Sequence, residues 1–170
     1  PRDSARGGRL YTIDLGPGVA SRGPALKTGS VATLLTGASF GIDFDPVADR
    51  VRVIGDDDQN LRVNPVDGSV TVDTSVAYPT GDPSAPSNPT ITGAGHTNPF
   101  GGARTTSLYV VDSALDVLAK QNPPNAGTLT TVGPLGIDIS GSNGSDVAAT
   151  DTGYLISAGP GPGLGAAGVP

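Results

Sequence analysis

The sequence has no cysteine, methionine, tryptophan or glutamate, and its 170 residues include one histidine and two lysines. Without cysteine the chain can form neither disulfides nor thiolate sites. A single imidazole excludes metal sites built on two or more histidines. All 16 acidic residues are Asp and lysine is rare, so most strong helix formers other than Ala and Leu are missing.

Aromatic residues and long apolar runs are also scarce. No run approaches the roughly 18 apolar residues that cross a bilayer, so we expect no membrane span. With three Phe and four Tyr, the core has to consist of Val, Leu, Ile and Ala, most of which suit strands. The 26 Gly and 16 Pro interrupt any long periodic pattern. Together these features predict an all-β fold.

The charge pattern limits the possible partners. The formal net charge is −6, and the ten basic residues are scattered singly. This distribution argues against a nucleic-acid footprint and against binding to an anionic membrane surface. Abundant Thr, Ser, Gly and Asn with little Lys are typical of secreted bacterial proteins, so we expect an extracellular or cell-surface location.

Three parts of the chain share the form strand, polar turn, strand. They are Arg9–Asp14 with Ser30–Leu35, Asn60–Asn64 with Ser69–Asp73, and Ser107–Asp112 with Thr128–Val132. Aligning Leu10, Leu61 and Leu108 gives spacings of 51 and 47 residues. Such a period is typical of the four-stranded blades of a propeller.

A second recurring piece opens the units with glycine. It occurs at Gly41–Pro46, more weakly at Gly93–Pro99, and at Gly136–Ser140. After the first of these, Val51 and Val53 alternate with Arg50 and Arg52, which indicates a half-buried strand whose arginines face solvent. The segment Asn64–Gly68 predicts a tight hairpin, because Asp-Gly supplies the positive φ of such a turn.

Two segments fall outside the repeats. Tyr78–Pro89 is interpreted as a long Pro-rich surface loop that crosses between blades. Gly159–Pro170 is interpreted as a flexible linker or an extended peptide.

Counting the units gives half a blade at 9–35, full blades at 41–73 and 91–132, and most of a blade at 136–157. Closed propellers have four or more blades. We therefore predict an all-β, incomplete β-propeller-like stack of three to four blades, made of antiparallel four-stranded sheets. It would occupy residues 1–157, with 158–170 as a Gly/Pro-rich extended tail.

Several unusual strings occur together in one order: Phe40–Pro46, Asp49–Val53, Gln59–Pro65, Ala94–Asn98 and Gln121–Leu129. They resemble the bacterial family catalogued as domain of unknown function 4394, over about residues 9–157. The resemblance implies a secreted, propeller-like protein with no established activity, so it suggests fold and location but no catalytic residues. It also implies a longer domain, with one more strand–turn–strand unit at each end.

His96 is the one candidate for general-base chemistry, with Asp43 or Asp112 as its partner. No Gly-x-Ser-x-Gly nucleophile elbow accompanies it. A hydrogen bond in a turn or between blades is the simpler use of this residue. Asp14, Asp43, Asp112 and Asp138 recur at corresponding strand ends, and this repetition predicts that they cap turns.

Two acidic segments are weak candidates for calcium. Asp56 and Asp58 belong to a run of three Asp, while Asp138 and Asp146 bound a Ser/Gly/Asn loop with oxygen side chains at alternate positions. Neighbouring side chains of an extended segment point to opposite faces. An exposed acidic turn and a Gly-Ser turn are therefore the favoured interpretations, and no cofactor other than possible calcium is expected.

The incomplete blade count favours a non-enzymatic structural function. A subunit whose terminal units lack strands can take them from a neighbour, and head-to-tail addition propagates into a fibre. The predicted partner is therefore another copy of the chain, and the predicted product an extracellular or cell-surface filament or matrix. The alternatives are an extracellular ligand-binding module and a metal-dependent, lactonase-like hydrolase with Asp43, Asn98 and Asp138 as inward ligands.

Overall fold

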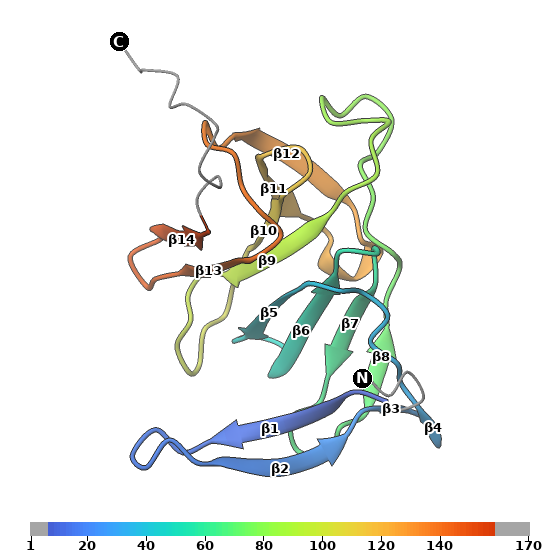
Figure 1. Ribbon diagram of the computed structural model, residues 1–170, viewed down its shortest axis with the longest axis vertical. Coiled ribbons are helices and arrows are strands. Elements are labelled where there is room, and N and C mark those ends of the chain that lie inside the picture. Colours follow the sequence, from blue (N-terminus) through green and yellow to red (C-terminus); the bar gives the residue numbers. More distant parts are fainter. Residues whose placement is uncertain (1–6, 159–170) are drawn as a thin grey trace.

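The computed structural model describes residues 7–158, which contain 14 strands, one 3₁₀ turn and no α-helix. Figure 1 shows the strands gathered into separate sheets that follow one another along the chain. The first six strands are β1 (Arg9–Ile13), β2 (Ala20–Ala25), β3 (Lys27–Thr28), β4 (Val31–Ala32), β5 (Phe40–Asp45) and β6 (Arg50–Gly55). The others are β7 (Asn60–Val63), β8 (Val70–Val72), β9 (Ile91–His96), β10 (Leu108–Asp112), β11 (Val117–Gln121), β12 (Leu129–Pro134), β13 (Asn143–Val147) and β14 (Gly153–Ser157), with η1 (Pro124–Ala126) before β12.

Two complete four-stranded sheets form the middle of the molecule. Their strand orders are β5-β6-β7-β8 and β9-β10-β11-β12, and every neighbouring pair is antiparallel. The pairs β1-β2 and β13-β14 form two-stranded sheets before and after them, and β3-β4 is a short ladder of two residues per strand. The predicted all-β, incomplete propeller-like stack is confirmed, with full blades near 41–73 and 91–132.

The first strands of successive sheets, β5, β9 and β13, approach one another closely because glycines lie at the contacts. A Cβ on Gly41 would lie 2.7 Å from the Gly93 carbonyl carbon, and one on Gly93 would lie 2.5 Å from Ser145 Oγ. Gly95 abuts Val147 in the same way. The recurring glycines of the sequence are therefore explained at 41 and 93 by the packing of one blade on the next.

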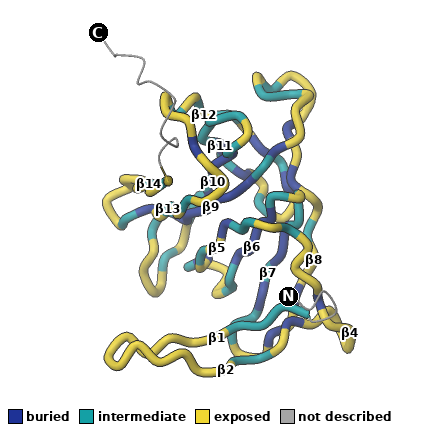
Figure 2. The backbone as a smooth tube through the Cα atoms, viewed as in Figure 1, coloured by how far each residue is buried: buried dark blue, intermediate teal, exposed yellow. Residues whose placement is uncertain are grey.

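Two clusters of buried aliphatic residues make up the core. One lies between the two complete sheets and joins Ile54 of β6 to side chains of β9 through β12. The other joins Leu26, in the connection after β2, to Val53, Leu61, Val63 and Val70 of the first complete sheet. In Figure 2 the buried segments follow these sheets, while most of the β1-β2 hairpin is exposed. The predicted aliphatic composition of the core is confirmed.

The connections between sheets repeat one geometry. After β2, the Lys27 amide donates to the Gly68 carbonyl at 3.0 Å, in the turn between β7 and β8. After β8, the Ala77 amide donates to the Gly127 carbonyl at 2.9 Å, in the turn between β11 and β12. Both glycines have positive φ. The connection after β2 thus contacts the first complete sheet in the same way that the connection after β8 contacts the second. Since β7 and β8 are the third and fourth strands of a blade, β1 and β2 correspond to third and fourth strands as well.

Some strand pairings differ from those predicted. The segment Arg9–Asp14 was expected to pair with Ser30–Leu35, but β1 pairs with β2 and the later segment contributes only β4. Likewise β10 and β12 are not partners, because β11 lies between them. Leu10, Leu61 and Leu108 are not equivalent, since Leu108 lies on a second strand and Leu61 on a third.

The last unit also begins later than predicted. Residues 136–140 form no strand, and Gly136 lies in a turn with φ +72°. The strand β13 begins at Asn143, inside the segment that was interpreted as a Gly-Ser turn. Only two strands of this unit, β13 and β14, lie among the described residues. Apart from Ala158, the predicted tail lies outside them.

The loops follow the predictions more closely. Asn64–Gly68 joins β7 to β8, with Gly68 at φ +72°. Tyr78–Pro89 lies in the connection between the two complete sheets, as predicted.

Across the described part of the chain, no helix is long and apolar enough to cross a membrane.

Candidate functional site

A histidine–aspartate contact joins the two complete sheets. His96 on β9 is fully buried, and its Nδ1 lies 3.1 Å from Asp43 Oδ2 on β5. The His96 backbone amide donates to the same oxygen at 2.5 Å. His96 Nε2 lies 3.8 Å from Asp45 Oδ2. The predicted hydrogen bond of His96 between blades is confirmed, and it is made to Asp43.

Asp43 is therefore not a turn cap, contrary to the prediction. It lies within β5, where its carboxylate faces the neighbouring sheet, and Asp45 caps the following turn by accepting from the Val47 and Ala48 amides at 2.9 Å. Asp14 and Asp112 do cap turns, through the amides of Gly16 and of Ala114. Asp112 also accepts from the Tyr78 hydroxyl at 2.9 Å, so it is not the partner of His96.

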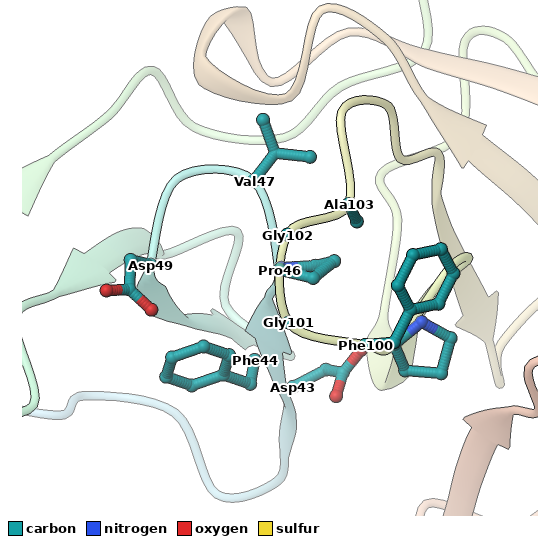
Figure 3. Close-up of a pocket in the computed structure, with 10 residues that line it drawn as sticks. Asp43, Phe44, Pro46, Val47, Asp49, Phe100, Gly101, Gly102 and Ala103 are labelled. Carbon is teal, nitrogen blue, oxygen red and sulfur yellow. The ribbon is translucent and has the colours of Figure 1, made fainter.

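A hollow of about 470 Å³ lies beside this contact, between the β5-β6 turn and the loop after β9. Figure 3 shows the Asp43 carboxylate on the side of Phe100, with Asp49 farther from Phe100, beyond Phe44. The hollow is lined by Asp43, Phe44, Pro46, Val47, Asp49 and the loop residues 99–103. It combines apolar walls with one inward carboxylate, which suits a small ligand with an apolar body and a donor group.

A buried arginine network is the second polar contact between the sheets. Arg52 on β6 is 1% exposed. It donates to Asn60 Oδ1 at 2.9 Å, to Asp73 Oδ2 at 2.7 Å and, in the next sheet, to Asn125 Oδ1 at 2.8 Å. Burial lowers the pKa of the Arg52 guanidinium, and its bond to Asp73 opposes that shift. Arg62, bonded to the same carboxylate, has a raised pKa because of that bond.

The prediction that Arg52 faces solvent is wrong. The alternation of Val and Arg along β6 is real, but the face that carries Arg52 packs against the next sheet, where Asn125 accepts a hydrogen bond from its guanidinium. One sequence signal was available. Arg52 and Arg62 are direct partners across β6 and β7, and two like charges in that position require a counter-ion between them. Asp73 supplies it.

The candidate calcium residues serve other contacts. Asp56 accepts from the Ala38 and Ser39 amides at 2.9 and 3.0 Å. Asp58 lies 3.3 Å from the Asn88 side-chain amide, and its burial raises its pKa. Asp146 accepts from the adjacent Val147 amide on β13, and Asp138 lies in the loop before that strand. Within residues 7–158, no three acidic or histidine side chains gather as a metal-binding group.

Two of the three expected inward ligands of a lactonase-like site, Asn98 and Asp43, bond other protein groups. Asn98 donates its side-chain amide to the Thr105 carbonyl within its own loop, and Asp43 is bonded to His96.

The two half-blades expose apolar side chains. On β1, Tyr11 and Ile13 are 59% and 63% exposed, and on β14, Tyr154 and Ile156 are 65% and 78% exposed. Figure 2 shows both segments largely in the exposed colour. Within residues 7–158, β1 pairs only with β2 and β14 only with β13, so no described strand covers the other edge of either. Exposed strand edges with apolar faces favour pairing with further strands.

Comparison with known proteins bears on the family. A family model described as a domain of unknown function, DUF4394, matches residues 5–162. The chain belongs to this family. No curated protein and no solved structure matches it. Because the description of DUF4394 names no activity, function has to be argued from the exposed half-blades and the contacts described above.

Proposed function

We propose that this DUF4394 chain is a secreted, non-enzymatic structural protein whose copies join through their open sheet edges into an extracellular or cell-surface filament or matrix. One observation carries the proposal. Apolar side chains are exposed at both ends of the stack, on β1 and on β14, where the neighbouring strands that would complete a blade are missing from the described residues.

The polar contacts support a structural use of the chain. Arg52, His96 and Asp112 are the most buried ionisable side chains, and each bonds a group on another segment of the stack. A general base has to reach the proton that it removes from a substrate. The fully buried imidazole of His96 is used to hold β9 against β5.

Secretion is proposed on composition. The chain has no glutamate and little lysine, and it is rich in Gly, Ser, Thr and Asn. A fractionation of the native host with an antibody to this chain tests the location. Recovery in the cytosolic fraction alone would overturn it.

Electron microscopy of the untagged protein over a range of concentrations tests the assembly. We expect elongated particles that lengthen as concentration rises, because head-to-tail contacts propagate without closing. Uniform monomers at all concentrations would overturn the proposal. A variant lacking residues 158–170 tests the tail, since assembly that survives this deletion must use the sheet edges.

A second candidate function is a ligand-binding module, and the hollow beside Asp43 and Phe100 favours it. Binding of glycans or other extracellular ligands, measured on an array with the wild type and with Phe100→Ala, tests it. Phe100 is half exposed on a loop, so the variant should fold normally. Equal binding by both proteins, or none by either, would exclude this site.

A further inference from the structure

The hairpin β1-β2 has the same turn as a hairpin inside a complete blade. In β7-β8, the Asn64 amide donates to the Ser69 carbonyl at 2.8 Å and the Gly68 amide donates to the Asn64 carbonyl at 2.9 Å. In β1-β2, Asp14, Val19 and Gly18 make the same two bonds, each at 2.9 Å. Gly18 and Gly68 both have positive φ, of 71° and 72°. Asp14 therefore corresponds to Asn64, Ile13 to Val63 and Tyr11 to Leu61.

The equivalent positions differ sharply in burial. Leu61 and Val63 are completely buried, in the cluster that contains Leu26 of the preceding connection. Tyr11 and Ile13 are mostly exposed. Gly68 is covered by the Ala25 carbonyl, whereas no atom lies within 4 Å of the Cβ position of Gly18. The β1-β2 hairpin thus presents a finished surface for a preceding blade, and that surface is uncovered.

The other end of the stack presents the opposite half of a blade. The strand β9 packs against β5, where Asp43 contacts the amide of His96. The strand β13 packs against β9 in the same way, where Gly95 abuts Val147. The strands β13 and β14 therefore correspond to the first two strands of a blade. Beside them lies a hollow of about 500 Å³ whose walls include Tyr109, Leu118 and Val132 of the preceding sheet. In a complete blade this space is filled by the third and fourth strands.

We propose that the β1-β2 hairpin of a second copy fills this hollow, pairs with β14 and completes a four-stranded sheet in the order β13-β14-β1-β2. This inference rests on the proposed self-association and names its interface. The two halves supply the two pairs of strands that one blade needs, in the right order, and no strand of the described residues occupies the outer edge of β14 or of β1.

The register of the junction follows from the complete sheet. There Val53 lies opposite Leu61, and Val51 opposite Val63. Leu155 corresponds to Val53, since each lies opposite an equivalent residue of its first strand, Ser145 and Ile42. Leu155 is therefore placed opposite Tyr11 of the second copy, and Gly153 opposite its Ile13. Tyr11 and Ile13 of the second copy then face Leu118 and Val132 of the first, and all four side chains become buried.

The partner is a second copy because two complete sheets separate β1-β2 from β13-β14 within one chain (Figure 1). The described residues of each copy form two complete blades and two halves. Two copies that exchange halves reciprocally would close a ring of six blades, within the usual range of about four to eight. Copies that add head to tail without closing would form the filament. The junction is the same in both assemblies.

Cysteine cross-linking in the naturally cysteine-free chain tests the register. One preparation carries Leu155→Cys, and a second, isotope-labelled preparation carries Tyr11→Cys, so a mixed disulfide identified by mass must join two copies. We expect this disulfide under mild oxidation. In the matched control, the isotope-labelled preparation carries Thr12→Cys in place of Tyr11→Cys. The side chain of residue 12 points to the opposite face of β1, so we expect no mixed disulfide.

A charge at the junction gives a second measurement. Ile13→Asp should abolish association in sedimentation velocity, because a carboxylate would have to be buried against Leu118 and Val132. Val66→Asp is the matched control: Val66 is also highly exposed, but it lies in the β7-β8 turn. Association should survive that change. Equal association of the two variants would overturn the proposed interface.

The outcomes separate this inference from the proposed function. Specific cross-linking with closed two-copy particles supports the junction and overturns the filament. Filaments without the specific cross-link support the filament and overturn the junction. A chain that remains monomeric overturns both.

Discussion

The guanidinium of Arg52 on β6 lies 2.8 Å from the side-chain oxygen of Asn125 in the η1 turn of the next sheet. The two residues are 73 positions apart. Because Arg52 is also bonded to Asp73 and Asn60, one buried cation ties three segments together. The contact between the complete sheets thus depends on a charged group as well as on aliphatic packing.

Removal of Arg52 should destabilise the protein strongly. Arg52→Ala leaves the buried Asn60 side-chain oxygen without its donor and removes one of the two cations that pair with Asp73, and breaking a buried pair costs about 3 to 5 kcal/mol. Arg62→Ala removes the other partner of Asp73, but Arg62 is 29% exposed, so we expect a loss of only about 1 kcal/mol. Urea denaturation checks both values. Equal losses would contradict the assignment of Arg52 as the central group.

Tyr78 should make stability fall at alkaline pH. Burial, together with the nearby Asp112 carboxylate, raises the pKa of the Tyr78 hydroxyl well above its usual range. Above pH of about 10 the tyrosine of the unfolded chain ionises, while the folded one stays protonated. The unfolded state therefore binds fewer protons, and the free energy of unfolding decreases as pH rises.

Tyr78→Phe should reduce this alkaline decrease while lowering stability at neutral pH by about 1 kcal/mol for the lost hydrogen bond. Tyr154→Phe is the matched control, because it removes the same hydroxyl group from a tyrosine that is largely exposed. Unfolding curves at several pH values between neutrality and pH 11 provide the comparison. A profile of Tyr78→Phe that matches the wild type would refute the prediction.

Gly41→Ala should weaken the packing of β5 against β9. The new methyl group would meet backbone atoms of Gly93 and Ala94, and overpacking of this kind costs about 1 to 3 kcal/mol. Gly101→Ala is a matched control, since no atom lies within 4 Å of that Cβ position. Thermal unfolding should show a lower Tm for Gly41→Ala alone. Equal Tm values for the two variants would contradict the close packing of β5 against β9.

Chelation should leave the stability of this chain unchanged. Asp56 and Asp146 are bonded to backbone amides, and no metal-binding group of three is present among residues 7–158. The Tm measured with EDTA and with added calcium should therefore agree. An increase of several degrees with calcium would show that carboxylates gather around the ion.

Much of the fold could be predicted because the repeats carry local signals. The hairpin at Asn64–Gly68, the aliphatic core and the two full blades follow from turn chemistry and alternation. The pairing errors arose because the third strand of the second blade, Val117–Gln121, includes Lys120 and lacks a clear alternation. The bonding of β1 to β2 was missed because Ala20–Ala25 contains Gly and Pro, which are depleted in strands.

The contacts between blades could not be predicted in the same way. Period-two alternation separates two faces of a strand, and it assigns one of them to solvent by default. Here the next sheet covers the face of β6 that carries Arg52, so the alternation predicts an exposed arginine although Arg52 is buried. The contact between His96 and Asp43 spans 53 positions. The sequence offered Asp43 and Asp112 as possible partners, and the choice between them depends on the packing of the sheets.

The connections between sheets impose an order on folding during synthesis. Leu26 packs against strands that follow it in the chain, and Val76 lies in the cluster formed with β9 through β12. Since a ribosome releases the amino-terminal residues first, each connection has to wait for the next sheet before its side chain can leave water. During synthesis, the apolar side chain of the newest connection therefore stays exposed to water until the next sheet has formed. Each completed sheet buries one such side chain and is followed by a new connection whose side chain is still exposed.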